Sequence, residues 1–127
     1  MKVKKHILVV EDNRDVLDVI RTILERLGHD VSLATNGKEG VEMARQQCPD
    51  LVVMDILMPI MDGFQAISLI KENPQTRTVP ILAVTALQGE RERCFKAGFD
   101  GYMTKPFTVD ELEATVERLL KRQQPAL

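Results

Sequence analysis

The stretch that decides the fold is Leu51-Val52-Val53-Met54-Asp55-Ile56-Leu57-Met58-Pro59. Its apolar residues run without polar alternation into a single carboxylate, and a loop follows. A short run of this kind is typical of a strand buried on both faces, as strands inside a parallel sheet are. Asp55 would then lie at the carboxyl end of a central strand, where open α/β sheets bind their ligands. The alternative is that Asp55 only caps the loop that follows it.

Similar short strands are predicted elsewhere in the chain, at residues 7–10, 31–34, 81–84 and 102–104. Between them apolar residues recur at helical spacing, which predicts helices over residues 13–27, 37–48, 63–73, 90–97 and 108–122. Strands and helices that alternate in this way form βαβ units. They predict an α/β fold with a doubly wound parallel sheet, right-handed crossovers and helices on both faces. We expect one domain over residues 1–127, with a core of about 5–122 and no output domain.

The bulk composition fits an ordinary globular domain. The 127 residues are 44% hydrophobic, and the formal net charge of −2 offers no general attraction to nucleic acid or to an anionic membrane. The apolar run at residues 7–10 is too short for a signal peptide or a membrane span. The two cysteines, Cys48 and Cys94, make no disulfide framework. We therefore expect a cytoplasmic protein.

Polar side chains follow four of the predicted strands. Glu11 and Asp12 follow the first, Asp55 the third, Thr85 the fourth and Lys105 the fifth. The carboxyl ends of parallel strands lie at one edge of a sheet, so we expect these groups to converge. Carboxylates brought together repel each other, and a hard cation such as Mg²⁺ relieves that repulsion.

The remaining groups of this constellation suit a phosphoryl group. Lys105 supplies a point charge for phosphate oxygens, and Thr85 supplies a hydroxyl donor. A cation, an ammonium and a hydroxyl around one carboxylate describe a phosphoryl-transfer site, where positioning and charge neutralisation supply most of the catalysis. Asp55 is the natural acceptor because it is central and because aspartate is a known nucleophile for phosphoryl groups.

The ordered motifs at the strand ends resemble those of response-regulator receiver domains of two-component signalling, and the resemblance covers residues 5–122. The motifs are Val9-Val10-Glu11-Asp12-Asn13, Met54-Asp55 with Met58-Pro59 and Met61-Asp62-Gly63, Val84-Thr85-Ala86, and Tyr102-Met103-Thr104-Lys105-Pro106-Phe107. The resemblance implies the flavodoxin-like (βα)5 fold with strand order 2-1-3-4-5.

The resemblance also implies roles for single residues. Asp55 would accept a phosphoryl group from a histidine kinase or a histidine phosphotransfer protein. Asp12, Asp55 and the backbone carbonyl of Leu57 would bind Mg²⁺, and Glu11 would act through a metal-bound water. Thr85 and Lys105 would hold phosphoryl oxygens. Tyr102 would turn inward as Thr85 moves toward the phosphoryl group. The Lys105-Pro106 peptide bond would be cis.

These roles describe a regulator that catalyses only its own phosphotransfer and slow dephosphorylation. Its output would be contact with a protein effector, and we expect no binding to nucleic acid or to a membrane. The protein would be a monomer or a phosphorylation-dependent dimer.

An aspartate-nucleophile phosphatase of the haloacid dehalogenase type would need a second aspartate where Leu57 stands. A flavodoxin-like cofactor carrier would place a phosphate against Glu11 and Asp12, which repel it. An unphosphorylated receiver scaffold is the third alternative, although every acceptor-site position is filled.

Several features depart from the family pattern or lie outside the site. The span from Thr85 to Lys105 is 20 residues, a little short for the family, so the fourth helix should begin late or be short. Leu57 and Leu87 offer no hydrogen bond to an attacking water, which predicts slow self-dephosphorylation. We expect both histidines, His6 and His29, at the surface, and both cysteines to be small buried or half-buried hydrophobes.

Overall fold

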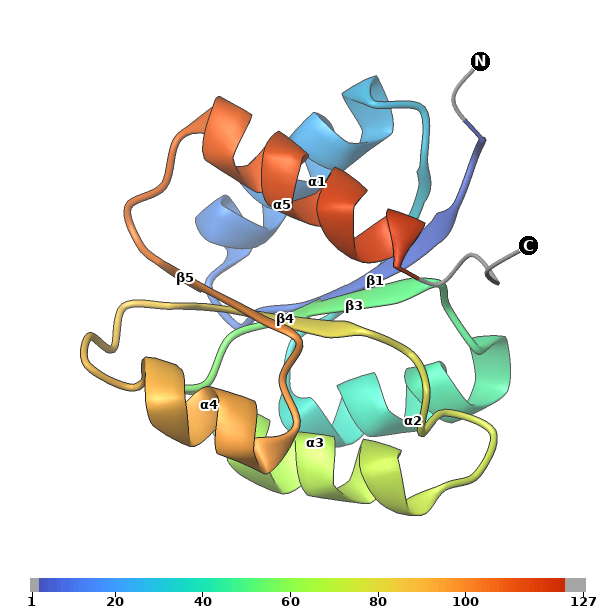
Figure 1. The fold of residues 1–127 in the computed structure, drawn as a ribbon, viewed down its shortest axis with the longest axis vertical. Coiled ribbons are helices and arrows are strands. Elements are labelled where there is room, and N and C mark those ends of the chain that lie inside the picture. The colour runs from blue at the N-terminus through green and yellow to red at the C-terminus, as the bar shows by residue number, and fades with distance from the viewer. Residues whose placement is uncertain (1–2, 123–127) are drawn as a thin grey trace.

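A computed structural model describes residues 3–122 as alternating strands and helices (Figure 1). The strands are β1 (His6–Val10), β2 (Asp30–Ala34), β3 (Leu51–Met54), β4 (Ile81–Thr85) and β5 (Gly101–Thr104). The helices are α1 (Arg14–Arg26), α2 (Gly37–Gln47), α3 (Gly63–Glu72), α4 (Arg91–Ala97) and α5 (Val109–Lys121). In residues 3–122 no helix is long and apolar enough to cross a membrane.

The strands form one parallel sheet in the order β2-β1-β3-β4-β5, which confirms the predicted fold class and strand order. Helices α1 and α5 cover one face, and α2, α3 and α4 cover the other (Figure 1). The central position of β3 explains why its sequence has no polar alternation, since both of its faces are buried.

Two hydrophobic cores lie on the two faces of the sheet. Successive strand side chains point to opposite faces, so Val52 and Met54 join the core under α2, α3 and α4, while Leu51 and Val53 join the core under α1 and α5. All four side chains are almost completely buried. The strand that leads to Asp55 is therefore fixed from both sides.

Local contacts also fix the loop after β3. Asp62 and Gln65 form a capping box at the start of α3, in which each side chain accepts a backbone N–H of the other residue. Gly63 packs so tightly that a Cβ there would lie 2.7 Å from the carbonyl oxygen of Asp55. Only glycine allows α3 to begin this close to the end of β3.

Helix α4 agrees with the shortening predicted from the sequence. It has 7 residues and begins at Arg91. The connection from β4 contains Gly89, whose φ of 77° lies in the left-handed region.

Two expectations outside the site were wrong. His29 is buried, because its ring lies at the amino-terminal edge of the sheet and Nδ1 accepts the backbone N–H of Lys5 at 3.1 Å. Cys48 is exposed rather than buried, because it ends α2 in the left-handed conformation (φ 46°), which turns it out of the core. Cys94 is buried, as expected.

Candidate phosphoryl-transfer site

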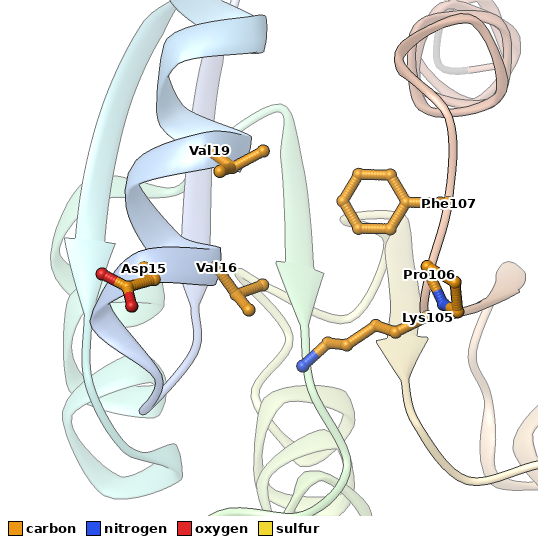
Figure 2. Close-up of a pocket in the computed structure, with 6 residues that line it drawn as sticks. All are labelled: Asp15, Val16, Val19, Lys105, Pro106 and Phe107. Atoms are coloured by element: carbon orange, nitrogen blue, oxygen red, sulfur yellow. The ribbon is translucent and has the colours of Figure 1, made fainter.

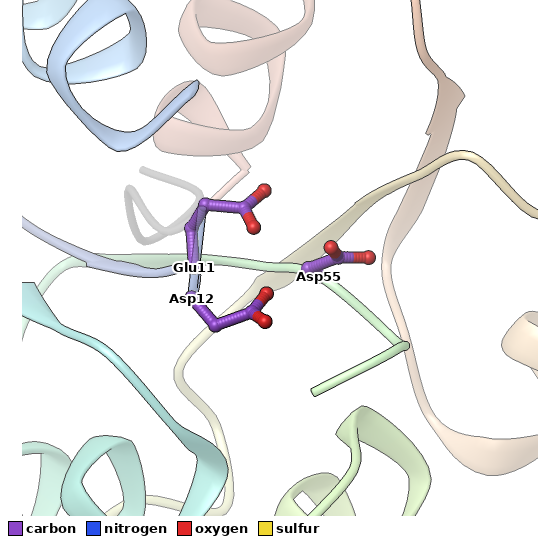
Figure 3. Close-up of side chains that lie close together, drawn as sticks. All are labelled: Glu11, Asp12 and Asp55. Atoms are coloured by element: carbon purple, nitrogen blue, oxygen red, sulfur yellow. The ribbon is translucent and has the colours of Figure 1, made fainter. Parts of the chain in front are cut away.

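The carboxyl ends of β1 and β3 bring three carboxylates together (Figure 3). Glu11, Asp12 and Asp55 each offer an oxygen that lies within 4.8 Å of the others. Glu11 and Asp55 are buried, whereas Asp12 is exposed. The pairing of β1 with β3 causes this convergence, because Val10 is opposite Met54 and the acidic residues follow immediately. The cluster is therefore open to solvent on the side of Asp12.

Both oxygens of Asp55 have partners. Oδ1 accepts the backbone N–H groups of Ile56 at 2.7 Å and Leu57 at 3.3 Å. Oδ2 accepts from the ammonium of Lys105 at 3.0 Å. These contacts orient the carboxylate at the end of its strand, where it stands 6% exposed.

Lys105 bridges two of the three carboxylates, since its Nζ also lies 2.5 Å from Oε1 of Glu11. Burial lowers the pKa of Lys105, but the hydrogen bonds to Glu11 and Asp55 outweigh it and raise the pKa above its usual value. Burial raises the pKa of Glu11, and the charge of Asp55 adds to this, while the hydrogen bond from Lys105 opposes it. At neutral pH the ammonium therefore stays charged and neutralises part of the acidic cluster.

The backbone of Lys105 lies in the connection between β5 and α5. Its backbone N–H donates to the carbonyl of Thr85 at 2.9 Å, and the Lys105-Pro106 peptide is cis, as the family resemblance implied. Beside it lies a hollow of about 440 Å³ between this connection and α1. Figure 2 shows the Phe107 ring facing Val19 across the hollow, while the Lys105 side chain extends toward the end of β3.

Thr85 and Tyr102 are joined through one residue, Leu87. The Thr85 hydroxyl accepts the Leu87 N–H at 3.2 Å, and the Tyr102 hydroxyl donates to the Leu87 carbonyl. Thr85 is fully buried and Tyr102 is half-buried. The two residues that the resemblance pairs in a switch therefore hold the two peptide groups on either side of the Leu87 Cα, in the β4–α4 connection.

The residues present fit a hard divalent cation. Three carboxylate oxygens lie within reach of a single ion, and oxygen ligands are the ones Mg²⁺ takes. The backbone of Leu57 lies beside Asp55, because its N–H donates to that carboxylate. Its carbonyl as a metal ligand stays a prediction.

The predicted site residues all lie at or just after the carboxyl ends of parallel strands, and so at the same edge of the sheet: Glu11, Asp12, Asp55, Thr85 and Lys105. Tyr102 is linked to Thr85 through Leu87. The sequence did not reveal the direct contact between Glu11 and Lys105, because 94 residues separate the two. It also did not reveal Leu87 as the link between Thr85 and Tyr102. A single sequence cannot reveal either contact. The first joins residues that are far apart in the chain, and the second uses the backbone of Leu87, which does not depend on residue type.

The comparisons with known proteins agree with this geometry. The profile of the family described as response regulator receiver domain matches residues 7–117. The chain belongs to this family. Receiver domains are phosphoacceptor signalling domains of two-component response regulators rather than ordinary enzymes.

Individual relatives of this receiver domain differ in length. The chain is 36% identical to the protein PilH of Pseudomonas aeruginosa, over 90% of the chain and 96% of PilH. It is also 36% identical to the DNA-binding dual master transcriptional regulator RpaA of Synechocystis, over 91% of the chain but only 49% of RpaA. The chain thus spans about half the length of one relative and nearly all of another.

A solved receiver structure supports the fit of the acidic cluster to a metal. The receiver domain of the sensor histidine kinase PA1611 of Pseudomonas aeruginosa is 39% identical, with a TM-score of 0.86, covering 94% of this chain and 99% of that chain. It carries a magnesium ion coordinated in the active-site cleft.

Proposed function

We propose that Asp55 accepts a phosphoryl group from a phosphohistidine of a histidine kinase or phosphotransfer protein. The observation that carries the proposal is the environment of its carboxylate. Asp55 lies at the end of the central strand with the Lys105 ammonium 3.0 Å from Oδ2 and with Glu11 and Asp12 beside it. A buried carboxylate with this neighbourhood is suited to accept a group that brings negative charge together with a cation.

In the proposed step a carboxylate oxygen of Asp55 forms a bond to phosphorus while the phosphorus–nitrogen bond of the donor breaks. The electron pair of that bond returns to the ring nitrogen, which leaves as neutral imidazole if the other ring nitrogen carries a proton. Lys105 and Thr85 would hold phosphoryl oxygens of the resulting acyl phosphate. Asp12, Asp55 and the carbonyl of Leu57 would hold Mg²⁺, with Glu11 acting through a bound water. When bound, the ion supplies positive charge for the phosphoryl oxygens.

The hollow between α1 and the β5–α5 connection supports docking of a donor protein beside Asp55. It is lined by apolar groups of Val16, Val19 and Phe107, and Val19 is exposed. A charge placed here by Val19→Glu should slow transfer from a phosphohistidine protein. It should leave labelling by a small phosphodonor unchanged, because Val19 is exposed on α1 and is not one of the clustered carboxylates. Unchanged transfer from the phosphohistidine protein would contradict docking in the hollow, and equal loss with both donors would assign the effect to the acceptor site instead.

The signal would leave the domain through Thr85 and Tyr102. Both bond to the backbone of Leu87, Thr85 to its N–H and Tyr102 to its carbonyl, so a movement of Thr85 toward a phosphoryl group would disturb the contact with Tyr102. Phosphorylation would then shift an existing equilibrium between two states that a protein effector distinguishes. Dimerisation on phosphorylation stays a prediction.

Intact mass spectrometry after incubation with a small phosphodonor and Mg²⁺ tests the assignment. We expect one phosphoryl group on the wild type and none on Asp55→Asn. Asp62→Asn is the matched control, because asparagine also caps a helix, and it should be labelled like the wild type. Labelling that persists in Asp55→Asn would overturn the proposal, as would sustained turnover of phosphomonoesters, which favours a phosphatase. A wild type that is never labelled would favour the unphosphorylated scaffold.

A further inference from the structure

Helix α4 is weakly anchored in the fold. It has 7 residues, all of which the structure describes, and Cys94 alone among them is buried. Glu90 occupies the N-cap position of α4, but its side chain makes no capping hydrogen bond to the helix. A helix this short is marginal by itself, so its position depends on contacts with the rest of the domain.

Both ends of α4 have a glycine in the left-handed region. Gly89 precedes the helix with a φ of 77°, and Gly98 ends it with a φ of 110°. A Cβ on Gly89 would meet nothing within 4 Å, so that backbone also has free space around it. Glycines at both ends of a short element would allow it to move as a unit, because glycine can absorb a large dihedral change at each end.

A cation–π contact joins α4 to α3. The guanidinium carbon of Arg93 lies 4.0 Å from the centroid of the Phe64 ring. The same ring packs edge-on against Phe99, just beyond the end of α4, with centroids 6.2 Å apart. Arg93 thus closes over a ring that is itself held in place by the core.

The other charged contacts of α4 stay within the helix or its first turn. Arg91 lies over Phe95 at 5.1 Å, and Lys96 pairs with Glu92 at 3.3 Å. These contacts stiffen the helix, but they do not attach it to another element. The contact between Arg93 and Phe64 is different because its partners belong to different helices.

We propose that α4 opens from α3 as a unit, hinged at Gly89 and Gly98, and that the cation–π contact between Arg93 and Phe64 is the latch that limits this opening. Opening exposes the thiol of Cys94 and the aromatic surface of Phe64. The proposal does not depend on phosphorylation of Asp55, so the two can fail separately.

Labelling of Cys94 by a thiol reagent measures the opening directly. The experiment uses the unphosphorylated full chain carrying Cys48→Ser, because Cys48 is exposed and would react first. Arg93→Gln should speed labelling of Cys94 about two- to fivefold, the factor expected from an exposed cation–π contact. Arg91→Gln, which removes a contact internal to α4, should leave the rate unchanged. Equal rates for wild type and Arg93→Gln, or equal acceleration by Arg91→Gln, would overturn the latch.

The reactivity of the thiol itself works against the expected result. Burial raises the pKa of Cys94, with Glu90 adding to this and Arg93 opposing it. Removing the charge of Arg93 therefore lowers the thiolate fraction, so faster labelling cannot come from a more reactive sulfur.

A double-mutant cycle separates the latch from the ion pair that Arg93 also makes with Glu90 at 3.7 Å. In a Phe64→Leu background, Arg93→Gln should have no further effect on labelling, whereas an undiminished effect would assign it to Glu90. The urea dependence of labelling distinguishes opening of α4 from unfolding of the domain, because a local opening exposes little surface. A urea slope as steep as that of global unfolding would overturn the hinged opening.

Discussion

The ammonium of Lys105 lies 3.0 Å from Oδ2 of Asp55, although 50 residues separate the two in the chain. The same ammonium also contacts Glu11, so it links the residues that follow β1 and β3. Lys105 therefore has two relations to the proposed chemistry. In the proposed function it would hold a phosphoryl group, and until one arrived it would compete with a metal ion for the same carboxylates.

The competition predicts that Lys105→Met strengthens Mg²⁺ binding. Removing a positive charge from beside three carboxylates should lower the Kd of Mg²⁺ by about three- to tenfold. This factor corresponds to a fraction of the Coulomb repulsion between the ammonium and the ion, because solvent screens part of it. Calorimetric titration measures the change. Lys71→Met is the matched control, because Lys71 lies near Asp100 at the other end of the sheet. An unchanged or raised Kd in Lys105→Met would show that the lysine does not compete.

The raised pKa of Lys105 predicts a stability that depends on alkaline pH. A lysine whose pKa is higher in the folded than in the unfolded protein stabilises the fold below its unfolded value, about 10.4, and this contribution is lost as pH rises through the folded value. Between about pH 9 and pH 12, the free energy of unfolding should therefore fall more in the wild type than in Lys105→Met. Urea titrations at both pH values measure it. Parallel losses in the two proteins would contradict the prediction.

The exposed leucine beside the proposed acceptor, Asp55, predicts slow loss of the phosphoryl group. Leu57 is 55% exposed and offers an incoming water no hydrogen bond. Leu57→Asn should speed the decay of the phosphorylated protein, and Leu87→Glu should also change it, as followed by phosphate release. Val109→Asn is the control, since Val109 is similarly exposed on α5. Decay at one rate in the wild type and both leucine variants would contradict the prediction.

The hydroxyl of Tyr102 predicts a contribution to stability. Tyr102→Phe removes the donor to the Leu87 carbonyl and keeps the ring, so the free energy of unfolding should fall by about 1 kcal/mol. Urea denaturation measures the change, and amide hydrogen exchange of Leu87 should become faster because the loop is less restrained. A variant as stable as the wild type, with unchanged exchange, would show that the hydrogen bond does not restrain the loop.

Much of the fold could be predicted because the strands are short apolar runs, and residues such as aspartate and glycine mark where the strands and helices end. The run at 51–54 ends in Asp55, and Gly28 stops α1 where the sequence indicated. The convergence of the candidate site residues was predictable for a related reason, since parallel topology brings the carboxyl ends of all strands to one edge, whereas their roles stay predictions. Contacts between side chains were less predictable. The burial of His29 and the reach of Glu11 to Lys105 depend on packing between distant segments.

Cys48 shows that local geometry can also escape sequence reasoning. A cysteine is a common buried residue, but this one ends α2 with a φ of 46°, a conformation that usually belongs to glycine. Cys48→Gly should therefore raise the free energy of unfolding by about 1 kcal/mol, measured by urea denaturation. Cys48→Ala should bring no such gain, because alanine retains the strain. An equal gain in both variants would assign the effect to loss of the thiol.

Locating the phosphoryl group within the chain tests the central claim most directly. The phosphorylated protein can be reduced with borohydride, which converts an aspartyl phosphate to homoserine, and the modified residue can be found by peptide mass spectrometry. We predict modification at Asp55 alone. Homoserine at Asp12 or Asp62 instead of Asp55 would contradict the assignment of Asp55 as the phosphoryl acceptor.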